Sequence, residues 1–138
     1  MATAHTKHVE GVAQSFANAI SSRSIEQMAL LMTEDHVFID SLGMRMEGKE
    51  LVTKAFAAYF RMVSDYAIEI QEVFSNGSVV AMIGSAHGMY SPDGMLAADN
   101  AWSTPAAWRV VMQDGLVAEW RVYADNEPIR QVMARNRK

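Results

Sequence analysis

Residues 36–43, His-Val-Phe-Ile-Asp-Ser-Leu-Gly, form the stretch on which the interpretation of this chain depends. The apolar run that ends at Ile39 predicts a strand, and Gly43 permits a turn after it. Asp40 therefore places a carboxylate among apolar residues. A charged group in such surroundings must be hydrogen-bonded, neutralised or directed into a cavity. Asp40 is accordingly the first candidate for a functional residue.

The composition is that of an ordinary globular domain. The chain has 138 residues, of which 50% are hydrophobic and 20% charged, and its formal net charge is −4. This length predicts one domain, residues 1–138, with a core of its own. The negative net charge argues against nucleic acid as a partner. The absence of cysteine excludes a disulfide framework and a thiol nucleophile.

The sequence shows no sign of a membrane or a metal. No apolar stretch approaches the length of a membrane span, and residues 1–5 lack the apolar run of a signal peptide. We therefore expect a cytoplasmic protein without membrane contact. No group of His, Asp and Glu has the spacing of metal ligands, so we expect neither a metal nor another cofactor.

Helical and strand patterns follow one another in an order that indicates an α+β fold. Apolar spacing predicts helices over roughly 7–22, from Ser24 until the polar residues 33–35, from Gly48 to roughly 63, and after residues 126–128. Alternation and turn residues predict strands over 36–43, 66–71, 79–90, 102–112 and 117–124, with hairpin turns at Asn76-Gly77 and Asp114-Gly115.

Three residues inside the predicted strands indicate irregular backbone. Gly84 and Gly88 suggest bulges or bends, and Pro105 argues for an edge, a bulge or a bend. A long, bent antiparallel sheet with helices on one face makes a cone with an apolar interior. Such an interior suits a small-molecule pocket.

Three segments, taken with this order of elements, resemble the nuclear transport factor 2-like superfamily. They are residues 29–43, ALLMTEDHVFIDSLG, residues 46–60, MEGKELVTKAFAAYF, and residues 117–129, VAEWRVYADNEPI. The chain is most similar to the SnoaL-like (polyketide-cyclase-like) and ketosteroid-isomerase-like branches. The resemblance implies a cystatin-like cone, in which a curved antiparallel sheet wraps around about three helices. It also implies no cofactor and a homodimer formed through the outer face of the sheet.

The resemblance assigns a role to Asp40. In ketosteroid isomerases the general base is an aspartate in an Asp-Pro-x-Gly-like turn after the first strand, and Asp40-Ser41-Leu42-Gly43 occupies that position. The tyrosine and second acid of that branch correspond to Phe16 and, within a shift of register, Ala107. Neither can donate a hydrogen bond to an enolate, so steroid isomerisation is not expected.

The end of the last strand carries a second resemblance. Residues 120–125, Trp-Arg-Val-Tyr-Ala-Asp, are similar to the Trp-Arg-x-Tyr-x-Asp ending of SnoaL-like proteins and limonene epoxide hydrolases. This implies Asp125 as a second catalytic acid. The strand 102–112 lacks the Arg-x-Asp pair of the hydrolases, which argues against epoxide hydrolysis. His87, in a central strand, is a third catalytic candidate because histidine shuttles protons near neutral pH.

Aromatic side chains wall the cones of this superfamily, and the resemblance therefore implies a pocket lined by aromatic residues. The candidates in this chain are Phe16, Phe38, Tyr59, Phe60, Tyr90, Trp102, Trp108 and Trp120.

The residues leave alternatives open. Asp40 is either a base in an apolar pocket or a strand-end residue bonded to the backbone of the next turn. Asp125 is either a catalytic acid or a residue favoured by the start of the closing helix. His36 has the parity of Asp40, but we expect it at the surface. Arg121 needs a carboxylate partner if its face of the strand is covered, and belongs to a solvated or dimer-contact surface if it is open.

The leading hypothesis is a small-molecule enzyme. Asp40 would remove a proton next to a carbonyl of an apolar, cyclic or polyketide-like substrate, which gives isomerisation, cyclisation or dehydration. The competing hypothesis is a non-catalytic ligand-binding or dimerisation module of the same fold, and Phe16 and Ala107 favour it. A nuclear-transport-type adaptor is a third class, although no feature selects a protein partner.

Overall fold

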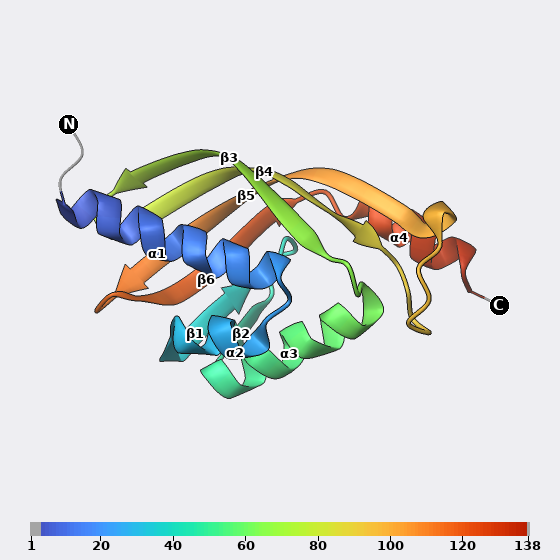
Figure 1. The fold of residues 1–138 in the computed structure, drawn as a ribbon, viewed down its shortest axis with the longest axis horizontal. Coiled ribbons are helices and arrows are strands. Elements are labelled where there is room, and N and C mark those ends of the chain that lie inside the picture. Colours follow the sequence, from blue (N-terminus) through green and yellow to red (C-terminus); the bar gives the residue numbers. More distant parts are fainter. Residues whose placement is uncertain (1–3, 138) are drawn as a thin grey trace.

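The computed structural model describes residues 4–137, and these form four α-helices and a six-stranded sheet (Figure 1). The helices are α1 (Ala4–Ser21), α2 (Ile25–Leu30), α3 (Lys49–Met62) and α4 (Glu127–Arg135). The strands are β1 (Met32–Ile39), β2 (Arg45–Glu47), β3 (Ala67–Asn76), β4 (Val79–Met89), β5 (Ala101–Gln113) and β6 (Leu116–Ala124). The predicted α+β class is confirmed.

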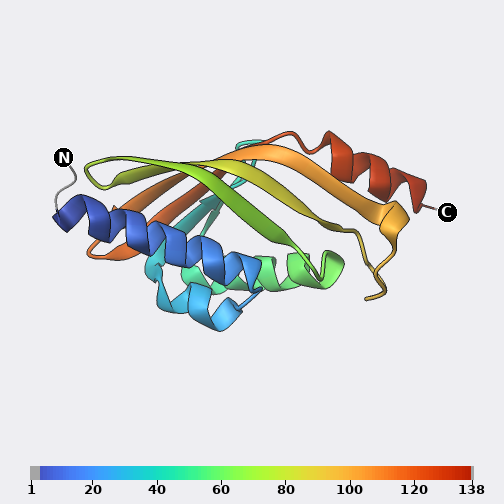
Figure 2. The ribbon, with the colours of Figure 1, turned by 45° about the horizontal axis from the view of Figure 1, so that its top comes forward.

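The sheet is a curved layer that covers the helices. Its strand order is β2-β1-β6-β5-β4-β3, and only the β1–β6 pairing among the described strands is parallel. Helix α1 packs against β3, α3 packs against β1, and α4 packs against β5. Figure 2 shows the long strands arching over α1, with α4 beyond the far end of the arch. This arrangement is the predicted cone.

Both predicted hairpin turns are present. Asn76 pairs with Val79 around Gly77, which has a φ of 62°. Asp114 and Gly115 have φ values of 53° and 79° between strands β5 and β6. Two successive residues with positive φ make the tight turn whose twist matches that of the flanking strands.

The glycines of β4 mark close approaches of the backbone. The register of β3 and β4 shifts between Ile70 and Glu72, so β3 carries an extra residue beside Gly84. A Cβ on Gly84 would lie 1.7 Å from the carbonyl oxygen of Glu69. A Cβ on Gly88 would lie 2.4 Å from Cγ1 of Val63. The missing side chain at Gly88 therefore leaves room for the side chain of Val63.

Pro105 lies inside β5, where it is opposite Ser85 of β4, and the register is unbroken there. The pairing of β5 with β6 begins only at Ala106, opposite Ala124. Strand β5 is therefore an edge at Pro105, which is where a strand tolerates a residue without an N–H. Of the three predicted alternatives, the edge is the correct one.

The sequence prediction is wrong around β1. Residues 33–35 continue the strand instead of ending helix α2, because β1 begins at Met32. Asp40 follows the strand instead of lying inside it, and the short strand β2 was not predicted. Helix α2 begins where predicted, after Ser24, whose Oγ atom accepts a hydrogen bond of 3.2 Å from the backbone N–H of Gln27 and so caps the helix.

His36 is fully buried, with 0% of its surface exposed, which corrects the expectation of a surface histidine. Its Nδ1 donates to the carbonyl oxygen of Val117 at 2.8 Å, and its ring stacks on Phe16 at a centroid distance of 5.8 Å. Its Nε2 is buried and has no hydrogen-bond partner among residues 4–137. Burial lowers the pKa of His36, although the bond to Val117 and the charges of Glu119 and Asp35 oppose this effect.

Protonation of His36 should therefore destabilise the fold in mild acid. The unfolded chain binds this proton near pH 6.5, the ordinary pKa of histidine, and the folded chain binds it only at lower pH. Stability is complete above this value and is lost as pH falls below it, with a slope of at most about 1.4 kcal/mol per pH unit. Urea unfolding between about pH 7.5 and pH 5.5 measures the slope.

The variant His36→Asn keeps a donor near Val117 and does not titrate, so it should unfold with a shallower pH slope. His8→Asn is the matched control, because His8 is exposed on α1 and its replacement should leave the slope unchanged. A slope that persists in His36→Asn would show that other groups produce it.

Candidate functional site

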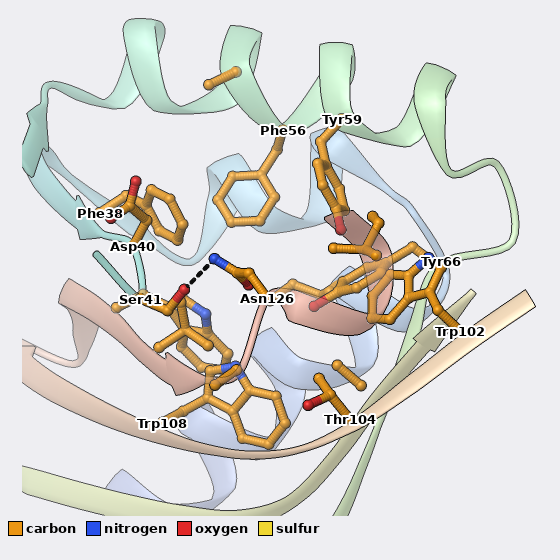
Figure 3. A pocket seen from close by; sticks show the side chains of 17 residues that line it. Phe38, Asp40, Ser41, Phe56, Tyr59, Tyr66, Trp102, Thr104, Trp108 and Asn126 are labelled. Atoms are coloured by element: carbon orange, nitrogen blue, oxygen red, sulfur yellow. Dashed lines mark hydrogen bonds between the residues drawn. The ribbon is translucent and has the colours of Figure 1, made fainter. Parts of the chain in front are cut away.

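The sheet, α3 and the start of α4 enclose a cavity of about 310 Å³ whose lining is mostly apolar (Figure 3). Side chains from β1, β4, β5 and β6 form its floor, and α3 forms its roof. The three tryptophans of the chain, Trp102, Trp108 and Trp120, all line it. A largely apolar cavity with a few polar groups is the usual form of a small-molecule site.

Five of the eight predicted pocket residues line this cavity, and they are Phe38, Tyr59, Trp102, Trp108 and Trp120. Phe16 and Phe60 are buried in the core, and Tyr90 is half-buried, but none of these three is among the lining residues. The inward face of the strands was therefore easier to predict than the direction of each helical side chain.

Asp40 lies at the rim of the cavity, beside Phe38 and Ser41 and across from Tyr66 and Trp102 (Figure 3). Its Oδ1 accepts hydrogen bonds of 2.9 Å from the backbone N–H groups of Leu42 and Met44. Its own N–H donates to the carbonyl oxygen of Met44 at 3.0 Å. Asp40 is thus bonded to the backbone of the turn between β1 and β2, which is one of the two alternatives given by the sequence. It also lines the cavity.

A hydrogen bond between side chains closes the same end of the cavity. Nδ2 of Asn126, at the start of α4, donates to Oγ of Ser41 at 2.6 Å. This bond joins residues that are 85 positions apart and ties the α4 end of the chain to the turn of Asp40. Both residues line the cavity. At this end of the cavity, the side chains of Ser41 and Asn126 are therefore hydrogen-bonded to each other.

The structure places Asp125 and His87 away from the cavity. Asp125 is exposed, and its Oδ1 accepts a 2.9 Å bond from the N–H of Glu127, at the first turn of α4. His87 is half-buried on β4. It lies on the same face of the strand as Ile83 and Ser85, opposite to the face of the buried Ala86. Neither is a lining residue. Their catalytic roles stay predictions, and the geometry brings neither to Asp40.

Two tyrosines stand at the other end of the cavity. Tyr59 from α3 and Tyr66, just before β3, have ring centroids 5.1 Å apart and perpendicular planes. Burial raises the pKa of both phenols, so both are neutral at physiological pH. Tyr66 was not selected as a site residue, although its alternation with Ile68 indicates that it shares the inward face of the strand.

A second hollow of about 220 Å³ lies next to the first. Tyr59, Asn126 and Ile129 line both. Met62, Met133 and Arg130 lie only around the second, which is open to solvent on the side of α4. We therefore take it as the approach to the main cavity.

The described residues offer no metal site: no group of three or more His, Asp or Glu side chains among them could hold an ion. Within the same residues, no helix has the length and apolar character needed to cross a membrane. The expectation of a cytoplasmic protein stays a prediction.

The SnoaL-like domain family matches residues 12–120 of the chain. The chain belongs to the SnoaL-like domain family. This places it in the nuclear transport factor 2-like superfamily, as the sequence resemblance indicated. No curated protein matches the chain.

Solved structures share the fold over nearly the whole SnoaL-like chain. A candidate SnoaL-like polyketide cyclase from Jannaschia sp. CCS1 has a TM-score of 0.81 and 16% identity, covering 97% of this chain and 94% of that chain. An LEH-like epoxide hydrolase from M. tuberculosis has a TM-score of 0.76 and 14% identity, covering 94% and 91%. A ketosteroid-isomerase-like protein from Catenulispora acidiphila, in complex with trimethylamine, has a TM-score of 0.74 and 15% identity, covering 86% and 88%. At these identities the likeness shows the fold alone.

The outer face of the SnoaL-like sheet is open to solvent. Arg109 pairs with Glu119 at 2.8 Å, and the Arg121 guanidinium lies 4.8 Å from the ring centroid of Tyr123. Ile83 and Tyr123 are 41% and 48% exposed, and both flank Ala107 in one row across the sheet. Arg121 itself is half-buried, and its Nε atom is buried without a hydrogen-bond partner among residues 4–137. The homodimer expected through this face stays a prediction.

The turn around Asp40 offers a test of its structural role. Asp40→Ala removes the acceptor of two backbone N–H groups and should lower the free energy of unfolding by about 1–2 kcal/mol. Asp40→Asn keeps an oxygen at the Oδ1 position and should lose clearly less. Urea unfolding of the two variants and the unaltered protein gives both differences. If Asp40→Ala is as stable as the unaltered protein, the two bonds do not hold the turn.

Proposed function

We propose that this SnoaL-like protein binds a small, mostly apolar and cyclic molecule in the cavity between α3 and the sheet. The observation that carries the proposal is the cavity of about 310 Å³ with aromatic walls. Burial of apolar ligand surface there would contribute about 25 cal/mol per Å². The ketosteroid-isomerase-like protein from Catenulispora acidiphila was solved in complex with trimethylamine, and this example of a small molecule bound by a protein of the same fold supports the proposal.

Partial filling of the cavity should weaken binding. Ala55 of α3 lines the cavity, and Ala58 is exposed on the same helix. We expect Ala55→Leu to weaken the binding of the bicyclic hydrocarbon tetralin at least about tenfold, because three added carbon atoms occupy the ligand's space. Quenching of tryptophan fluorescence reports the binding, since all three tryptophans line the cavity.

Ala58→Leu is the matched control, because it makes the same change on the solvent side of α3. It should bind tetralin as the unaltered protein does. Equal affinities for Ala55→Leu and Ala58→Leu, or no binding by the unaltered protein, would refute the cavity as the ligand site.

A second candidate function is catalysis, with Asp40 as a general base that removes a proton next to a carbonyl. Its position in the cavity wall and the matching turn of ketosteroid isomerases support this role. Its bonds to Leu42 and Met44 engage only Oδ1, and no hydrogen bond to Oδ2 is present among residues 4–137. Isomerisation, cyclisation and dehydration all begin with this step. The two hydrogen bonds from backbone N–H groups are equally compatible with a residue that only stabilises the turn. In that case the protein is a non-catalytic ligand-binding module.

Proton abstraction can be tested without knowledge of the natural substrate. A ketone whose α-hydrogens exchange with D2O in the presence of the protein has lost a proton to a base. We expect 1-tetralone to gain deuterium at C2 faster with the unaltered protein than with Asp40→Asn, by about 100-fold, a typical contribution of a general base. Mass spectrometry measures the deuterium content.

The exchange experiment separates the two candidate functions. The Asp40→Asn variant should still bind 1-tetralone, because the cavity walls are unchanged. Binding without Asp40-dependent exchange by the unaltered protein would favour the non-catalytic module.

A further inference from the structure

The cavity holds unused hydrogen-bond donors at the end away from Asp40. Within the described chain, the hydroxyl groups of Tyr59 and Tyr66 make no hydrogen bond to protein. Nε1 of Trp102 is buried and also has no partner among residues 4–137. The Trp102 side chain lies against Tyr66, with ring centroids 6.0 Å apart. Figure 3 shows the phenol oxygens of both tyrosines directed toward the interior of the cavity.

An unpaired donor in an apolar site is costly. A buried polar group without a partner destabilises the fold by about 1–3 kcal/mol, so such groups are normally paired. Nε1 of Trp102 is closed off from the cavity itself, whereas the hydroxyl groups of Tyr59 and Tyr66 face it (Figure 3), so a partner for the two phenols comes from outside the protein. A phenol hydroxyl both donates and accepts, and it donates where that partner presents an acceptor.

The charge of that acceptor follows from the lining. Among the described residues that line the main cavity there is no Lys, Arg or His, so a full negative charge would be buried there without a counter-charge. Burial of an unpaired carboxylate or phosphate is far more costly than burial of a neutral polar group. The phenols are themselves neutral, since burial raises the pKa of Tyr59 and of Tyr66. The site therefore suits a polar but uncharged oxygen.

We propose that Tyr59 and Tyr66 form a subsite that binds a neutral carbonyl oxygen of the ligand, with the ring of Trp102 packed against Tyr66. The ligand class is then a cyclic ketone or a related neutral carbonyl compound, with its apolar rings against Phe56 and Trp108 and its carbonyl oxygen at the two phenols. These donors come from α3 and from the residue that precedes β3. They are not the positions of Phe16 and Ala107, where the resemblance to ketosteroid isomerases had suggested that donors are absent.

The inference rests on the proposed binding function and adds the identity of the polar group. It also assigns opposite chemistry to the two ends of the cavity. The donors stand at one end, and the carboxylate of Asp40 stands at the rim across from them (Figure 3). A bound carbonyl compound would therefore have its oxygen beside the phenol donors and its more remote carbons nearer to the carboxylate of Asp40.

The test compares 1-tetralone with tetralin, which have the same bicyclic skeleton with and without a carbonyl group. Binding to the full chain is measured by calorimetry for the unaltered protein and for Tyr59→Phe, Tyr66→Phe and the double variant. Each lost hydrogen bond should weaken 1-tetralone binding about fivefold. Tetralin binding should not weaken, because phenylalanine keeps the ring.

Tyr123→Phe is the matched control, because Tyr123 is exposed on the outer face of the sheet and does not line the cavity. It should bind both probes as the unaltered protein does. The carboxylate of the same skeleton, tetralin-1-carboxylate, should bind at least about tenfold more weakly than 1-tetralone, because the cavity offers it no cation.

Infrared spectroscopy provides a direct readout of the bond. The carbonyl stretch of bound 1-tetralone should lie at lower frequency than in a hydrocarbon solvent, and the double Tyr→Phe variant should remove most of this shift. If tetralin binds and 1-tetralone shows neither the shift nor a tyrosine dependence, the subsite is refuted and the binding function stands. If tighter binding of the carboxylate is found, the neutral acceptor is refuted. If no probe enters the cavity, the proposed function and the subsite fall together.

Discussion

The close approach of β3 to β4 at Gly84 is the constraint on which the shape of this protein depends. A Cβ at that position would overlap the carbonyl oxygen of Glu69, at 1.7 Å, so β3 can cross there only over a glycine. The extra residue of β3 beside it breaks the regular register. A bulge bends its strand and increases the local twist. The sheet therefore arches over α1 (Figure 1), and a cavity of about 310 Å³ remains between the sheet and α3.

The cavity follows from this curvature together with the pattern of side chains. Strands β4 and β5 alternate buried and exposed residues along nearly their whole length, so one face is continuously apolar. Trp102, Thr104 and Trp108 project from that face of β5 toward α3. Helix α3 contributes Phe56 and Tyr59, which meet them from the opposite side. The aromatic rings contact one another around the space without closing it, and close packing is lost there.

Much of the fold could be predicted from local chemistry. The turns at Asn76-Gly77 and Asp114-Gly115 follow from backbone requirements of single residues, and the helices follow from apolar spacing. The errors concern features that depend on distant partners. Residues 33–35 look polar enough for a loop, yet they lie in β1 between Met32 and Val37, whose pairing partners on β6 are over 80 residues later in the chain. Burial of His36 has the same origin, since its Nδ1 partner is Val117 of β6. Period-two alternation also fails on β6, where a register shift between β5 and β6 turns Val117 inward with Trp120.

The site was predicted less completely than the fold because its polar residues depend on three-dimensional pairing. Asp40 was found from its apolar neighbours, but no local pattern shows that Leu42 and Met44 both donate to its Oδ1. Asn126 carries only the signal of a helix start, although its side chain reaches Ser41 across the cavity end. Conversely, the resemblance implied Asp125 as a second acid beside Asp40, and the structure places it outside the cavity, where its Oδ1 accepts from the N–H of Glu127 at the start of α4.

The polar groups at the two ends of the cavity differ in whether they have hydrogen-bond partners within the protein. At the rim, Asp40, Ser41 and Asn126 are bonded to the turn or to one another, and these bonds contribute to stability without any ligand. At the far end, the hydroxyl groups of Tyr59 and Tyr66 have no hydrogen-bond partner among the described residues. A fold gains nothing from leaving donors unpaired, whereas it gains from the bonds at the rim. The unpaired end is therefore the part of the cavity whose chemistry is best explained by a ligand, and the rim is the part that the fold itself requires.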